Sequence, residues 1–189
     1  MKLVFATNNS NKLSEIRSLV PDGIEILSLK EINCNEELPE TNPTLKENAL
    51  QKARYVFDNY GFNCFADDTG LEIDALGGEP GVYSARYAGE GCKAEDNVNK
   101  VLEKLEGEEN RKAKFRTVIA LIIDGKETLF EGECKGEITQ TKSGVEGFGY
   151  DPIFIPNGYQ LTFAEMNKVE KGAVSHRGKA IKRLVAFLY

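Results

Sequence analysis

The chain has 189 residues, which suits one domain or two lobes that share a cleft. Its formal net charge of −6 argues against general nucleic-acid binding, which needs a basic surface, while 41% hydrophobic residues are enough for a core. No apolar run approaches the roughly 18 residues of a membrane span, and the first residues lack the apolar core and cleavage site of a signal peptide.

Cysteine usage favours a reducing compartment. Cys34, Cys64, Cys92 and Cys134 are widely spaced, without a C-x-x-C pair, and the chain has a single histidine. This set does not match a zinc site. We therefore expect four reduced thiols, mostly packing residues, in a cytoplasmic protein.

The first half of the chain predicts strands that alternate with helices. Short apolar runs predict strands over 3–6, 24–29, 64–68 and 70–76. Apolar residues at helical spacing predict a helix over 13–20, which Pro21-Asp22-Gly23 ends. A second amphipathic helix is expected from the capping box at Thr44 to Gly61.

The second half predicts a helix around 98–105 and then a hairpin, with strands over 115–123 and 128–138 around Asp124-Gly125. Ser175 is expected to cap a final helix. This order of elements predicts an α/β protein with a mixed sheet and flanking helices. A cleft between two lobes is a natural ligand site in such a fold.

The segment from Thr7 to Lys12 joins the first strand to the first helix. Free N–H groups at a helix start attract anions, and a lysine in the first turn opposes the helix dipole unless an anion lies between them. The segment therefore indicates a phosphate site, although an ordinary helix cap with a solvated lysine fits equally well.

The final helix repeats this pattern. His176, Arg177 and Lys179 follow Ser175, and Lys171 lies just upstream. Two helix starts with misplaced positive charge, in an acidic chain, favour a small and highly anionic ligand over a solvated basic face.

Asp67 and Asp68 end an apolar strand. Neighbouring strand residues point to opposite faces, so we expect one of the two to face the cleft. Carboxylates suit Mg²⁺ and accept protons from water, but acids in a turn also cap backbone N–H groups. Glu36, Glu37 and Glu40 are candidates for a second metal ligand, against the simpler interpretation of solvated loop acids.

Residues 147–152 read Gly-Phe-Gly-Tyr-Asp-Pro. The glycines allow close backbone approach, Phe148 or Tyr150 suits stacking on a base, and Asp151 suits hydrogen bonds from ring N–H groups. A buried aromatic turn is the alternative.

Together these motifs resemble the inosine triphosphate pyrophosphatase family, which removes deaminated purine nucleotides. The matching blocks occur in the family's order over nearly the whole chain: ATNNSNK (6–12), LKENALQKAR (45–54), ADDTGLEIDALGGEPGVYSARYAG (66–89), GFGYDPIF (147–154) and EKGAVSHRGKA (170–180). The resemblance implies one domain over residues 1–189, with an elongated sheet and two lobes around a central cleft. It also implies a homodimer.

The resemblance also implies roles for the matching residues. Asp68 would be the general base and, with Glu40, would bind Mg²⁺. Thr69 and Lys171 would contact the substrate, and His176 with Arg177 would read the base edge. The triphosphate would be bound by Thr7, Asn8, Asn9, Ser10, Asn11 and Lys12. The base would be held by Phe148, Gly149, Tyr150 and Asp151.

This chain departs from the family pattern at Asn8, where glycine is frequent, and at Thr69, where serine is common. The segment before Glu40 matches the family pattern loosely.

The reaction that the resemblance implies is hydrolysis of ITP, dITP and XTP to the monophosphate and pyrophosphate, which keeps wrong bases out of DNA and RNA.

Base choice has a physical rationale. Arg177 is always a donor and His176 can be one, whereas a 6-keto purine offers an acceptor and adenine an amino group. Arg177→Ala is then expected to lower the catalytic efficiency on ITP and so narrow the difference in catalytic efficiency between ITP and ATP.

Three alternatives stay open at this point. A pyrophosphatase for modified pyrimidine or methylated nucleotides would use a related cleft. A nucleotide sensor would need no carboxylate base at position 68. A dinucleotide-dependent oxidoreductase is disfavoured because no G-x-G-x-x-G follows the first strand.

Overall fold

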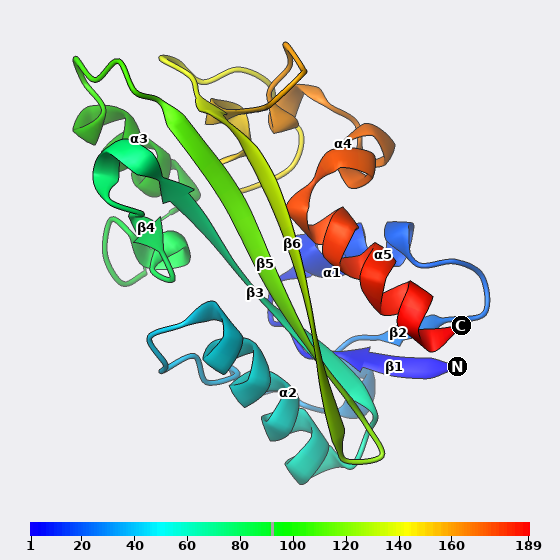
Figure 1. Ribbon diagram of the computed structural model, residues 1–189. Helices are drawn as coiled ribbons and strands as arrows, with labels where there is room; N and C mark the ends of the chain where they lie inside the picture. The colour runs from blue at the N-terminus through cyan, green and yellow to red at the C-terminus, as the bar shows by residue number, and fades with distance from the viewer. Residues whose placement is uncertain (92) are drawn as a thin grey trace. The chain divides into compact units, whose positions relative to one another are not determined.

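The computed structural model describes residues 1–91 and 93–189, and Figure 1 shows the order of its elements. The strands are β1 (Lys2–Phe5), β2 (Glu25–Leu27), β3 (Cys64–Ile73), β4 (Pro80–Gly81), β5 (Lys112–Ile123), β6 (Lys126–Ile138) and β7 (Phe154–Pro156). The α-helices are α1 (Ser10–Leu19), α2 (Leu45–Tyr60), α3 (Ala94–Lys104), α4 (Lys168–Val174) and α5 (His176–Leu188). No helix within the described residues has the length and apolar character to cross a membrane.

The seven strands of the described chain form one mixed sheet in the order β2-β1-β3-β5-β6-β7, with β4 paired to β3. β1 is parallel to β2 and β3, whereas β4 and β7 are antiparallel to their neighbours. The predicted hairpin joins β5 to β6, because Asp124 and Gly125 adopt the positive φ angles, 50° and 78°, that a type I′ turn needs. The predicted α/β class with a mixed sheet is confirmed.

The chain forms two compact units. Unit 1 comprises Met1–Asp68, Thr117–Gly132 and Arg177–Tyr189. Unit 2 comprises Thr69–Arg116 and Glu133–His176. Strands β3, β5 and β6 each contribute residues to both units, so the chain passes between them without leaving extended structure.

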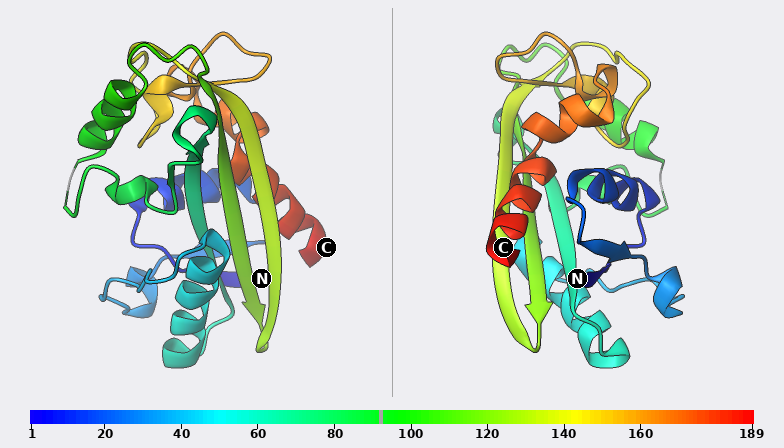
Figure 2. Two further views of the ribbon diagram at one scale, coloured as in Figure 1. Left: turned by 60° about the vertical axis from the view of Figure 1, so that its left-hand side comes forward. Right: turned by 90° about the vertical axis from the view of Figure 1, so that its right-hand side faces the viewer.

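Unit 1 has a core on each face of its strands, because successive strand residues point in opposite directions. Leu3 and Phe5 of β1 pack in one cluster with residues of α1 and α5. Val4 of β1 and Ala6, which follows it, pack in the other cluster with residues of α2. Figure 2 shows α2 and α5 on opposite sides of these strands. The alternation of β1 therefore determines which helix covers each face.

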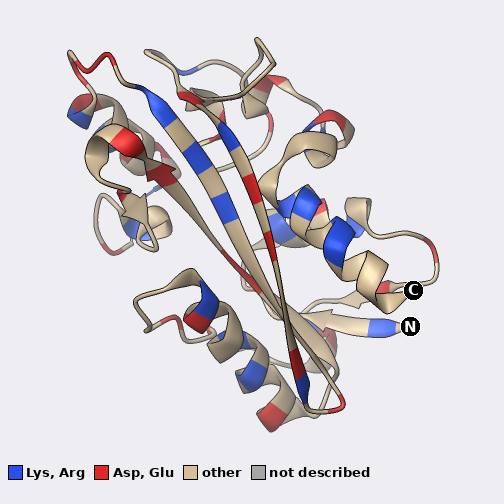
Figure 3. Ribbon diagram, in the orientation of Figure 1, with Lys and Arg blue, Asp and Glu red and all other residues tan. Residues whose placement is uncertain are grey.

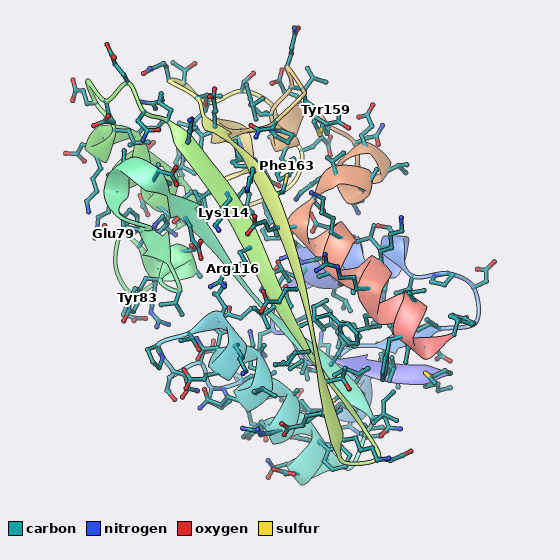
Figure 4. All side chains as sticks on the ribbon, viewed as in Figure 1. Glu79, Tyr83, Lys114, Arg116, Tyr159 and Phe163 are labelled. Atoms are coloured by element: carbon teal, nitrogen blue, oxygen red, sulfur yellow. The ribbon has the colours of Figure 1, made fainter. Side chains whose placement is uncertain are left out.

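Unit 2 follows the same rule on β5. Phe115 packs in the core, where its ring lies 4.7 Å from that of Phe154 and 5.9 Å from that of Phe163. Lys114 and Arg116, labelled in Figure 4, point to the opposite face and form ion pairs with Glu72 of β3. Figure 3 shows this part of β5 as basic bands beside acidic bands on β6. The unit thus has one apolar face and one charged face.

One sequence prediction of secondary structure was wrong, and one helix was not predicted. The two strands expected over 64–68 and 70–76 are one strand, β3, which runs to Ile73, and Asp74–Leu76 form a short 3-10 helix. Asp67 and Asp68 therefore lie inside a strand rather than in a turn. The predicted final helix after Ser175 is confirmed as α5, whereas α4, which begins with a capping box at Asn167 and Glu170, was not predicted. Ser175, in extended conformation, ends α4 directly before α5.

The cysteines agree with packing roles where the structure describes them. Cys34, Cys64 and Cys134 are free thiols and buried. Cys92, the fourth predicted thiol, lies outside the described residues.

Candidate functional site

The loop before α1 uses its own polar side chains to cap the helix. Asn9 is the N-cap, and its Oδ1 accepts from the backbone N–H groups of Asn11 (2.9 Å) and Lys12 (3.1 Å). Thr7 Oγ1 accepts from the Asn9 N–H at 3.1 Å. Ser10 is exposed at the first position of the helix. Asn9 therefore caps α1, and its role toward a phosphate stays a prediction.

Lys12 is not a solvated lysine. Its Nζ lies 3.0 Å from Asp67 Oδ1, and its side chain is only 14% exposed. Burial lowers the pKa of the Lys12 amine, and the Asp67 carboxylate opposes that effect. The lysine that opposes the helix dipole is thus held by a carboxylate from β3.

Asp67 lies at the centre of a buried ion-pair network, here called the Asp67 cluster: Lys12, Glu15, Asp67 and Arg177. Arg177 donates from Nε and Nη2 to Asp67 Oδ2, both at 3.2 Å, and from Nη1 to Glu15 at 2.6 Å. Burial by itself would raise the pKa of the Asp67 carboxyl, but Lys12 and Arg177 together hold that pKa well below its usual range. These two cations therefore favour the ionised form of Asp67.

Asp68 points to the other face of β3 and has different partners, as strand alternation predicts. Its Oδ2 accepts from Asn48 Nδ2 at 3.2 Å, and its Oδ1 lies 3.9 Å from Lys52 Nζ. Lys52 also pairs with Glu40 and donates to the Asp67 carbonyl oxygen at 2.7 Å. These four residues, Glu40, Asn48, Lys52 and Asp68, form the Asp68 cluster.

The Asp68 cluster sets the charge states of its members. Burial raises the pKa of the Asp68 carboxyl, and the Lys52 ammonium acts against that rise. Burial disfavours the Lys52 ammonium, but Asp68 and Glu40 outweigh this and raise its pKa. One buried ammonium therefore brings two carboxylates together.

Sequence reasoning missed Lys52 and Asn48 as site residues. Both lie on the core-facing stripe of α2, which also carries Leu45 and Ala49, and both are buried. The available signal was a lysine and an asparagine at helix positions where the spacing predicts apolar residues.

The glycine-aromatic loop in unit 2 is organised by Asp151. Its Oδ2 accepts from Lys171 Nζ at 2.6 Å and from the Phe148 N–H at 3.0 Å. Lys171 Nζ also lies 4.9 Å from the centre of the Phe148 ring. Gly147 has a φ of 72°, and a Cβ there would lie 2.0 Å from Asp151 Oδ2, so the loop requires glycine at this position.

The two aromatic candidates of this loop differ in environment. Tyr150 is 6% exposed, packs in the unit 2 core and donates its hydroxyl to the Ser84 carbonyl oxygen at 2.6 Å. Phe148 is only partly buried. Phe148 is thus better suited than Tyr150 to stack on a ligand, and Gly149, with a φ of 60°, separates them.

The remaining predicted residues are distributed between the units. Thr69, partly buried, follows Asp68 on β3 as the first residue of unit 2. His176 is 3% exposed and stacks on Phe115 in unit 2, with ring centres 4.6 Å apart. Arg177 belongs to unit 1, where its guanidinium donates to Asp67 and Glu15.

No group of three or more His, Cys, Asp or Glu side chains within the described residues is arranged to hold a metal ion. Glu40 and Asp68 nevertheless both contact Lys52 Nζ, so two carboxylates converge. Because Mg²⁺ commonly binds one or two carboxylates together with water and substrate phosphate, this donor set fits it.

Comparisons with known proteins cover nearly the whole chain. The family model of the Ham1 family matches residues 3–187. The chain is 57% identical over 188 residues to the dITP/XTP pyrophosphatase of Flavobacterium johnsoniae, covering 100% of this chain and 98% of the relative. It is 54% identical over 188 residues to the protein of that name from Porphyromonas gingivalis, covering 99% and 97%.

Solved structures agree with this match. The Ham1 protein of Staphylococcus aureus superposes with a TM-score of 0.88 at 40% identity, covering 100% of this chain and 98% of that one. A HAM1 protein from Coxiella burnetii superposes with a TM-score of 0.90 at 40% identity and the same coverage.

Proposed function

We propose that this chain, which belongs to the Ham1 family, hydrolyses deaminated purine nucleoside triphosphates. The family match confirms the resemblance that the sequence motifs indicate. The chain is a nucleoside triphosphate pyrophosphatase, and the relatives' names support dITP and XTP as substrates. The products would be the nucleoside monophosphate and pyrophosphate, with ITP as a further substrate.

The observation that carries the proposal is the Asp68 cluster. Asp68 is a largely buried carboxylate beside a buried lysine, and Glu40 joins it at the same ammonium. A carboxylate in such a position can accept the proton of an attacking water, and a lysine can donate to phosphate oxygens. We assign the base to Asp68 and phosphate contacts to Lys52 and Lys12.

Glu40 and Asp68 would hold Mg²⁺. When bound there, the ion would offset phosphate charge and make a coordinated water more acidic. The Lys52 ammonium contacts both of these carboxylates and would add a positive charge for the substrate phosphates. Asn48 would continue to donate to Asp68 and keep its Oδ2 in place.

In unit 2, we assign base stacking to Phe148 and a polar contact to Lys171. Lys171 Nζ lies near the Phe148 ring and is paired with Asp151, so a ligand on the ring would meet an ammonium of fixed position. The base-reading role that the resemblance implies for His176 and Arg177 stays a prediction. So do the homodimer and the cytoplasmic location.

The test is pyrophosphate release from dITP, XTP, ITP, GTP and ATP, with Mg²⁺ and with chelator, for the wild type, Asp68→Asn and Asp58→Asn. Asp58 is an exposed acid on α2 and serves as the matched control. We expect dITP and XTP to be strongly preferred, and Asp68→Asn to lose about 10³-fold or more, as removal of a general base does. Asp58→Asn is expected to match the wild type.

Other outcomes point to specific alternatives. Preference for a pyrimidine triphosphate would contradict the substrate class but leave the hydrolysis intact. Binding of triphosphates without pyrophosphate release would favour a nucleotide sensor. Activity of Asp68→Asn equal to that of Asp58→Asn would remove Asp68 as the base.

A further inference from the structure

The segment that carries Glu40, residues 36–42 (the acidic segment), is held at both ends by side chains of α2. At its start, Tyr60 donates its hydroxyl to the Glu36 carboxylate at 2.7 and 2.8 Å. At its end, Gln51 accepts from the Thr41 N–H at 3.0 Å. Its position relative to α2 is therefore determined by hydrogen bonds rather than by regular secondary structure.

Between these ends, the side chain of Asn8 reaches the backbone of the acidic segment. Asn8 Nδ2 donates to the Glu36 carbonyl oxygen at 3.0 Å, and Asn8 Oδ1 accepts from the Leu38 N–H at 2.9 Å. A side-chain amide carries one acceptor oxygen and a nitrogen with two N–H donors, and the oxygen and one N–H are used here on one stretch of backbone. These two hydrogen bonds set the orientation of the peptide planes from 36 to 38.

The side chain of Asn8 therefore bonds to the backbone of the acidic segment instead of facing a phosphate. Its Oδ1, a pure acceptor, already accepts from Leu38 and would repel a phosphate oxygen. We propose that Asn8 is a positioning residue, which orients the acidic segment so that Glu40 meets Lys52 and Asp68. The proposal rests on the proposed function, because it concerns the placement of a metal ligand for that reaction.

The chain geometry limits how large the effect can be. Glu40 lies two residues after Leu38, so a turn of the Leu38 peptide displaces the Glu40 carboxylate from Lys52. The Leu38 side chain is buried in the unit 1 core, so the segment stays attached when Asn8 is shortened. We therefore expect a change in orientation and not unfolding.

The direct test is amide hydrogen exchange of the ligand-free protein, followed at Leu38 by NMR. In Asn8→Ala the Leu38 N–H loses its acceptor, and we expect its exchange to quicken by about tenfold or more. Asn11→Ala is the matched control, because Asn11 lies three residues after Asn8 in the first turn of α1, is exposed and joins the Asn9 cap through its backbone N–H. It is expected to leave Leu38 exchange unchanged.

Kinetics on dITP separate positioning from phosphate binding. A positioning role predicts that Asn8→Ala lowers kcat about tenfold, equivalent to about 1.4 kcal/mol of barrier, with a smaller change in KM. In a Glu40→Gln background, Asn8→Ala is expected to have little further effect, since both changes act on one group. Direct Mg²⁺ titration by calorimetry is expected to show weaker binding in both single variants.

The outcomes are separable. A raised KM with unchanged kcat, or an additive loss in the double variant, would overturn the positioning role and return Asn8 to the phosphate. Unchanged Leu38 exchange in Asn8→Ala would overturn it too. A wild type that releases no pyrophosphate from any purine triphosphate would instead refute the proposed function, while Leu38 exchange would still report on the Asn8 contact.

Discussion

Arg177 and Asp67 form an ion pair with almost no access to solvent. Arg177 is 2% exposed and Asp67 0%. Such pairs add little net stability when complete, but removal of one partner leaves a buried charge with less compensation, because Asp67 would keep Lys12 but lose the guanidinium. At the scale of single residues, Arg177 is therefore as much a structural residue as a candidate for base recognition.

Arg177→Ala is expected to destabilise the protein by about 3–5 kcal/mol, because Asp67 and Glu15 lose their shared partner. Urea unfolding followed by circular dichroism measures this loss. Arg183→Ala, an exposed arginine on the same helix, is the control and should change stability by no more than about 0.5 kcal/mol. Equal effects of the two variants would contradict the role of the buried pair.

If Arg177 also reads the base, Arg177→Ala is expected to change substrate preference as well as stability. This role requires that the preference for ITP over ATP shrinks when both rates are measured below the unfolding temperature. A stability loss with an unchanged substrate ratio would restrict Arg177 to the Asp67 cluster.

At the scale of elements, the loop that carries Phe148 depends on close approach between its ends. Gly147 and Gly149 both have positive φ angles, which glycine adopts without strain. They differ in surroundings, because a Cβ at 147 would collide with Asp151 whereas a Cβ at 149 meets nothing within 4 Å. A comparison of substitutions at the two glycines therefore separates the effect of the collision with Asp151 from the effect of backbone strain.

Gly147→Ala is expected to displace the Asp151 carboxylate and loosen Lys171, so KM for dITP rises at least about tenfold, equivalent to about 1.4 kcal/mol. Gly149→Ala bears a similar backbone strain of about 1 kcal/mol and is expected to keep KM within a few-fold of the wild type. Steady-state kinetics on folded protein decide the matter. Indistinguishable KM values for the two variants would show that Asp151 does not organise this loop for substrate.

At the scale of the whole molecule, three strands contribute to both compact units. A unit cannot unfold alone without breaking strands that continue into the other one. The chain is therefore expected to unfold in a single cooperative transition despite its two units.

Large-to-small changes of buried residues in each unit test this expectation. Phe65 in unit 1 and Phe154 in unit 2 are both fully buried, and each change to alanine should cost about 3–5 kcal/mol. Both variants are expected to lower one shared urea midpoint, with tyrosine fluorescence and circular dichroism coincident. Separate transitions for the two probes would mean that the units unfold independently.

The sequence by itself determined the local elements and the family. Thr44 caps α2, Gly61 ends it in left-handed conformation, and Asp124-Gly125 forms the hairpin turn, as predicted. Caps and turns are readable because they depend on residues a few positions apart. The five motif blocks identified the family for a similar reason, since they are contiguous stretches of chain.

Only the tertiary structure decided which charged groups meet. Asp67 and Arg177 are 110 residues apart in sequence, and Asn8 reaches Leu38 across 30 residues. Whether Lys52 was a surface residue or a partner of Asp68 depended on the packing of α2 against β3. Contacts of this kind arise when separate elements bury their apolar faces together, so spacing along the chain does not reveal them.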